Sequence, residues 1–200
     1  MSLKDQPQRH KGVQAERTTA PAPVTAAEPG SGARFVAVVR IATGLVFAWA
    51  FLDKLFGLGY ATPAERAWIN GGSPTKGFLG NIDHGPLAEM FRGMAGAWWA
   101  DWLFMLGLAG IAVALLSGIG LRIAAGAGTL MMLLMWAAEW PLDRFTDAGE
   151  PTMSTNPVLD YHVLYALVMI WLAIVAAGNV WGFGKQWANI DVVRKNPWLR

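Results

Sequence analysis

The residues of this sequence that could carry out chemistry are six charged or titratable side chains within or at the ends of apolar segments. Three are predicted catalytic residues that handle protons: Glu139, Asp160 and His162. Three are predicted to bind a substrate or quinone: Arg40, Asp53 and Lys54. An imidazole exchanges protons near neutral pH, and basic side chains attract anions or polarise carbonyl oxygens. Such a set suits a quinone headgroup, which takes up protons with electrons, or a small oxyanion.

A structural interpretation of the same residues stays open, because charged side chains at helix ends also mark the boundary between hydrocarbon and water. Arg40 lies about 8 Å inside its apolar segment, at ~1.5 Å per residue, so it either snorkels or faces a cavity. Lys54 shares a helical stripe with Arg40, so both face the same side. Asp160 and His162 diverge on a helix, and we therefore expect any carboxylate bonded to His162 to come from another helix.

The elements that must position these residues are apolar helices. Hydrophobic residues make up 54% of the 200 residues and charged residues only 15%, which is too apolar for an ordinary soluble domain. Four runs, at 35–56, 102–119, 121–140 and 158–178, are each near the ~20 residues that cross a bilayer. The predicted fold is an all-α integral membrane protein, a four-helix bundle spanning 34–180.

Several kinds of function are excluded by composition. The sequence contains no Cys, so disulfides, persulfide relays and Cys-ligated clusters are all absent. Three histidines spread over a tail, a loop and a helix do not suit a paired-histidine haem site. A net charge of +2 with scattered basic residues does not predict nucleic-acid binding, and no metal site is predicted.

The segments outside the apolar runs have separate predicted roles. Residues 1–33 lack apolar periodicity, which predicts a disordered tail. Residues 58–101 are predicted to form an outer lid with short helices, one capped by Thr62 and one beginning near Pro86. Lys and Arg concentrate in the tail and in the segment 181–200, so the positive-inside rule places both termini in the cytoplasm.

Four stretches of the sequence resemble the DoxX/DoxD family of small four-helix bacterial membrane proteins. They are Arg40 with "GLVFAWAFLDKLFG", then "GIGLRIAA", "MMLLMWAAEW" and "DYHVLYALVMI". The resemblance covers about 34–200 and implies a multi-pass protein of the bacterial plasma membrane. It also implies Arg40, Asp53, Lys54, Asp160 and His162 as family-like positions.

The resemblance implies a function in sulfur-compound oxidation and redox homeostasis. DoxD-like proteins are described as membrane subunits of a thiosulfate:quinone oxidoreductase, and DoxX-like proteins as anchors for redox partners. We therefore expect a quinone-linked oxidoreductase subunit with quinone as its cofactor. The alternative is a non-enzymatic anchor that holds a redox protein or respiratory complex at the membrane. Transport of a small anion is a third reading, which would require a homo-oligomer because four helices form only a small pathway.

Overall fold

The structure, a computed structural model, describes residues 28–200, and most of the predicted tail lies outside them. Four long helices carry the apolar runs: α1 (Ser31–Phe56), α4 (Trp98–Ser117), α5 (Leu121–Glu139) and α6 (Tyr161–Ile174). Shorter elements follow α1: η1 (Ala64–Arg66), η2 (Trp68–Asn70), α2 (Lys76–Leu79) and α3 (Ala88–Met94). Others follow α6: η3 (Ala177–Asn179), α7 (Gly184–Ala188), α8 (Asp191–Lys195) and η4 (Pro197–Leu199). Across the described residues the protein is helical, with one isolated β-bridge.

Three of these helices, α1, α4 and α5, are long and apolar enough to cross a membrane. The fourth, α6, has 14 residues and is therefore only about 21 Å long at ~1.5 Å per residue. Large apolar side chains are exposed along all four helices, among them Leu45, Leu103, Leu130 and Leu164. An exposed apolar surface of this extent is stable in lipid and not in water, which supports membrane insertion.

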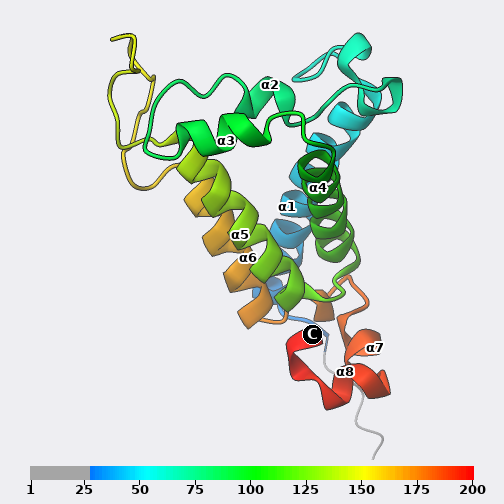
Figure 1. Ribbon diagram of the computed structural model, residues 1–200. Helices are drawn as coiled ribbons and strands as arrows, with labels where there is room; N and C mark the ends of the chain where they lie inside the picture. Colours follow the sequence, from blue (N-terminus) through cyan, green and yellow to red (C-terminus); the bar gives the residue numbers. More distant parts are fainter. Residues whose placement is uncertain (1–27) are drawn as a thin grey trace, which may run out of the picture.

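The long helices pack in pairs, α1 with α4 and α5 with α6, and α4 also contacts α5 (Figure 1). Their shared core includes Phe47, Met105, Ile111 and Leu172, all buried. Phe47 of α1 meets the Tyr165 ring of α6 edge to face at 6.0 Å. This contact joins the two pairs, so residues at the same end of different helices are held in a defined arrangement.

The predicted fourth helix, 158–178, is too long at both ends. At its start the backbone of Asp160 is extended, and the helix begins at Tyr161. At its end the chain turns at Ala176, which has a φ of 50°, and Gly178 packs against the backbone of Gly118. A Cβ on Gly178 would lie 2.1 Å from the Gly118 carbonyl oxygen, so this close approach requires glycine. The end of α6 is thus set by contact with the α4–α5 connection.

The residues after α6 fold back on the same end of the molecule (Figure 1). The Trp187 indole donates to the Leu199 carbonyl at 2.7 Å, and Val193 is fully buried. The Arg122 side chain donates to the Pro197 carbonyl at 2.9 Å. The C-terminal segment is therefore a packed part of the structure.

Residues 58–101 cover the opposite end of the long helices, where α2 and α3 lie across the end of α5 (Figure 1). Leu79, Ile82 and Phe91 form a small buried cluster with Ala138 of α5. The helix predicted near Pro86 is present as α3. The predicted Thr62 cap is wrong, because Pro63 is the N-cap of the short η1 and no side chain caps it.

Asp101, in the first turn of α4, ties this covering segment to the helices. One carboxylate oxygen, Oδ1, accepts from Thr75 N at 2.9 Å, Thr75 Oγ1 at 2.6 Å and Ser73 Oγ at 2.9 Å. Asp101 is itself buried. Buried hydrogen bonds to a charged acceptor are among the stronger contributions to local stability.

Replacing Asp101 with alanine is therefore expected to lower the free energy of local unfolding of residues 73–96 by about 2–4 kcal/mol. The long helices should stay folded. Hydrogen exchange in detergent should show faster exchange in those residues alone. Asp191→Ala, at the far end of the molecule, is the matched control and should leave that exchange unchanged. Equal exchange in Asp101→Ala and the unmodified protein would contradict the anchoring role.

Candidate functional site

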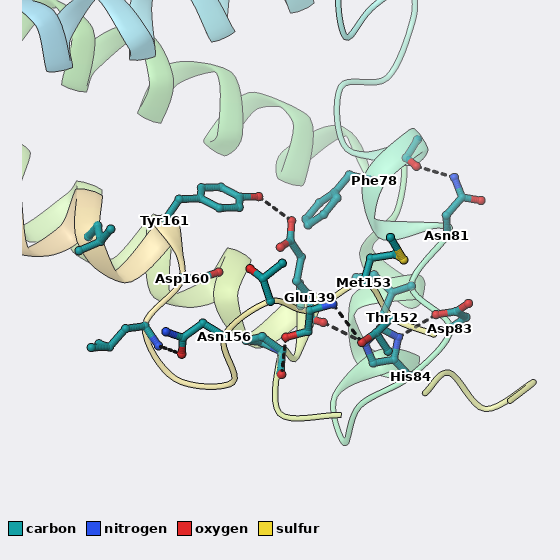
Figure 2. Close-up of a pocket in the computed structure, with 18 residues that line it drawn as sticks. Phe78, Asn81, Asp83, His84, Glu139, Thr152, Met153, Asn156, Asp160 and Tyr161 are labelled. Carbon is teal, nitrogen blue, oxygen red and sulfur yellow. Dashed lines mark hydrogen bonds and ion pairs between the residues drawn. The ribbon is translucent and has the colours of Figure 1, made fainter. Parts of the chain in front are cut away.

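A pocket of about 580 Å³ lies where α5 ends and α6 begins, below the covering segment. Figure 2 shows side chains from three parts of the chain around it: the α2 region, the end of α5, and the loop and first turn leading into α6. Its polar lining includes Asp83, His84, Glu139, Asp160 and Tyr161. Its apolar lining includes Phe78, Ile82, Leu159 and Leu164.

Asp160 bonds directly to His162, so the prediction that these side chains diverge is wrong. Asp160 is the N-cap of α6, with a ψ of −175°, and its Oδ1 accepts from Val163 N at 3.2 Å. Its Oδ2 lies 2.7 Å from His162 Nδ1. The helical separation of i and i+2 side chains does not apply, because the N-cap residue lies outside the helix.

Glu139 joins the same group from the end of α5. Its Oε2 lies 3.9 Å from His162 Nδ1, and its Oε1 accepts from the Tyr161 hydroxyl at 2.9 Å (Figure 2). The Glu139 carbonyl lies 3.0 Å from His84 Nε2, and His84 in turn contacts Asp83 at 2.8 Å. The three predicted catalytic residues therefore form one cluster, held by contacts from both sides.

The three residues of the cluster differ in how deeply they are buried. Glu139 and Asp160 are half-buried and line the pocket, whereas His162 is only 1% exposed and lies behind them. Within residues 28–200, no Lys or Arg makes an ion pair with either carboxylate. His162 Nε2 also has no hydrogen-bond partner there. The arrangement can receive a proton at the pocket wall and share it with a buried imidazole.

Asp53 and Lys54 are placed elsewhere on the same end of the molecule. Asp53 is buried, and its carboxylate accepts from the backbone amides of Tyr60 at 3.3 Å and Ala61 at 3.1 Å. The Lys54 ammonium lies 5.8 Å from the centre of the Phe104 ring. Asp53 thus stabilises the turn after α1, and neither residue lines the pocket.

Arg40 lies at the opposite end of α1, about 20 Å from Asp53 at ~1.5 Å per residue. It is fully buried and does not snorkel. Its guanidinium donates to the carbonyls of Leu115 and Leu116, at the end of α4, and of Trp181, at 2.7 Å, in the segment after α6. The stripe shared by Arg40 and Lys54 does face inward, but their charges meet different partners.

Tyr161 and His84 belong to the pocket, although neither was predicted as a site residue. Tyr161 lies between the two residues that the sequence did single out, and helical geometry would turn it away from them. It reaches Glu139 because the long phenol spans from one helix end to the next. His84 sits in a loop between short helices, where the sequence carries no periodic signal that would place it.

Comparisons with family models, with curated proteins and with solved structures found no match to this chain. The geometry of the pocket and the motifs described above are therefore the basis for assigning a function.

Proposed function

We propose that this protein is the membrane subunit of a quinone-linked oxidoreductase, with the quinone headgroup in the pocket between α5 and α6. The observation that carries the proposal is the cluster of Glu139, Asp160 and Tyr161 in the pocket wall, backed by the buried His162. A quinone headgroup is a flat, largely apolar ring with two carbonyl oxygens, and it suits a pocket that combines apolar walls with a few polar groups.

Access from the lipid supports a quinone over a water-soluble substrate. Tyr161 and Leu164 line the pocket and are also 54% and 56% exposed on the outer face of α6. Leu167 and Trp171 continue that exposed face along the helix. An isoprenoid tail could lie along this stripe while the headgroup enters sideways, because the stripe is apolar and faces the hydrocarbon in an inserted protein.

The residues of the cluster would then move protons. A bound quinone would accept two electrons and two protons. Tyr161 and Glu139 lie at the pocket wall, where the carboxyl group can give a proton to a carbonyl oxygen. His162 and Asp160 share a proton across 2.7 Å, and a side-chain rotation that closes the 3.9 Å gap between the imidazole and Glu139 Oε2 would let that proton reach Glu139. Because the chain has no Cys, the electrons would come from the cofactor of a partner redox protein.

The proposal includes a fourth membrane crossing by α6, which packs along α5 and exposes leucines on its outer side. The charge distribution supports cytoplasmic termini in a bacterial plasma membrane, with the pocket on the outer side. The resemblance to DoxX/DoxD proteins supports thiosulfate as the electron donor to such a complex. Arg40 has no part in this site, since it does not line the pocket and its terminal guanidinium nitrogens donate to backbone carbonyls at the other end of the helices.

Quinone binding by the isolated protein tests the proposal. We expect purified protein to retain quinone, detected by mass spectrometry of a solvent extract, and to bind an added short-chain quinone. Leu164→Trp should fill the lateral entrance and weaken that binding about tenfold or more, since the larger ring overlaps the site. Leu130→Trp, at a similarly exposed leucine of α5, should bind quinone as the unmodified protein does.

Equal quinone affinity in all three proteins, or none in any of them, would overturn the proposal. A quinone-free preparation that instead carries a redox enzyme or respiratory complex would favour the anchor function. The exposed Ile190, Val192 and Trp198 around α8 offer an apolar surface for such a partner.

A further inference from the structure

We infer that Glu139, Asp160 and His162 form a binding site for one divalent transition-metal ion such as Zn²⁺, Mn²⁺ or Fe²⁺. The inference concerns the metal-bound form of the cluster, in which the ion occupies the atoms that the proton relay would use, and it does not depend on quinone binding. It rests on the positions of three potential ligand atoms, on how each carboxylate is held, and on the charge of the cluster.

The ligand atoms converge from two elements. One atom each from Glu139, Asp160 and His162 lies within 4.8 Å of the others. An ion held at ~2.1 Å from each ligand keeps those ligands roughly 3 to 3.5 Å apart. The observed separations from His162 Nδ1, 2.7 Å to Asp160 Oδ2 and 3.9 Å to Glu139 Oε2, lie on either side of that range. Small rotations of the side chains would therefore admit the ion.

Each carboxylate is held by one oxygen and presents the other to the centre. Asp160 Oδ1 accepts from Val163 N, which leaves Oδ2 toward the imidazole. Glu139 Oε1 accepts from the Tyr161 hydroxyl, which leaves Oε2 on the same side. Contacts of this kind orient the ligands of metal sites, and Tyr161 and the Val163 amide would take that role here.

A divalent cation would also balance the negative charge of the cluster. Two carboxylates face a single imidazole nitrogen, and across residues 28–200 no Lys or Arg pairs with either of them. A proton on Nδ1 is close enough to bond to Asp160 but lies too far from Glu139 Oε2, at 3.9 Å, to satisfy both. A divalent ion would contact all three atoms at once and offset both negative charges.

The ligand set indicates the class of ion. One imidazole and two carboxylates, with no thiolate, suit first-row divalent metals better than Ca²⁺ or Mg²⁺, which prefer oxygen alone. The carboxylates line a pocket of about 580 Å³, so water or a substrate oxygen can complete the coordination. His162 is 1% exposed and would close the inner side of the site.

The test is metal titration of detergent-purified, chelator-treated protein without added quinone. We expect one Zn²⁺ per chain by elemental analysis and a visible absorption band with Co²⁺ that Zn²⁺ removes. Glu139→Gln and His162→Gln should each lose the band or weaken Zn²⁺ binding at least tenfold. Tyr161→Phe removes only the contact that holds Glu139, and we expect about 10-fold weaker binding with an unchanged helical spectrum.

The matched control is Asn81→Ala, which removes a side chain in the same pocket that bonds only to the Gly77 carbonyl and should leave Zn²⁺ binding unchanged. Zn²⁺ that persists in Glu139→Gln and His162→Gln, or that is lost in Asn81→Ala, would overturn the assignment. Absence of Zn²⁺ and Co²⁺ binding in the unmodified protein would do the same. Quinone binding is measured separately, so the failure of either proposal leaves the other standing.

Discussion

Arg40→Leu is expected to destabilise the protein by about 3–5 kcal/mol, the largest stability effect we predict for a single substitution. The guanidinium donates to carbonyls of Leu115 and Leu116 and to that of Trp181, in a fully buried site. A leucine leaves those carbonyls without donors. These carbonyls belong to the end of α4 and to the segment after α6. The substitution therefore removes the hydrogen bonds by which Arg40 joins these two parts of the molecule.

Thermal unfolding in detergent, followed by circular dichroism, measures this effect. Arg34→Leu is the control, since Arg34 lies in the same helix, is exposed, and pairs with an exposed Glu28 at 2.7 Å. Arg40→Lys should recover only part of the stability, because one ammonium cannot reproduce the planar set of donors. Similar melting temperatures for Arg40→Leu and Arg34→Leu would show that the buried contacts do not stabilise the fold.

His162→Gln is expected to lower quinone-dependent turnover by about 10²- to 10⁴-fold in the complex with its redox partner. Glutamine keeps a hydrogen bond toward Asp160 but exchanges no proton near neutral pH, so the relay behind Glu139 would be interrupted. Because His162 lies behind the pocket wall, quinone affinity should change little. The expected signature is a fall in kcat with a similar KM.

The pH profile of turnover separates proton transfer from a merely structural role. With His162 as the relay, the pH profile of turnover should differ between the variant and the unmodified protein, whereas their helical spectra should match. Asn81→Ala, at a residue that also lines the pocket, is the control, since its exposed side chain bonds only locally to the Gly77 carbonyl. Unchanged turnover in His162→Gln would remove His162 from the mechanism.

The helical, membrane-inserted character of the chain was predictable because it depends on composition and length alone. Apolar runs such as 121–140 satisfy their backbone groups internally as helices, whatever surrounds them. The shared stripe of Arg40, Phe47 and Lys54 on α1 was predictable for the same reason, since their spacing follows from helical geometry, but its inward direction was not. Glu139, Asp160 and His162 could be singled out from the sequence as candidates, because charged or titratable groups at the ends of apolar helices are rare.

The contact between Asp160 and His162 and the end of α6 could not be predicted, because both depend on local departures from helical geometry. Asp160 reaches His162 only because the backbone of Asp160 is extended, so helical spacing misplaced it. The end of α6 is set by the contact of Gly178 with Gly118, residues that are distant in sequence.

By itself, the sequence determined that this chain forms apolar helices and where its titratable groups stand along them, because periodicity and hydropathy are local properties. Only the tertiary structure decided which charges meet. Arg40, Asp53 and Asp101 satisfy backbone groups or hydroxyls of neighbouring segments, whereas Glu139, Asp160 and His162 face one another beside a pocket. The physical reason is that a side chain's partners are set by packing between helices and loops, which no single segment specifies.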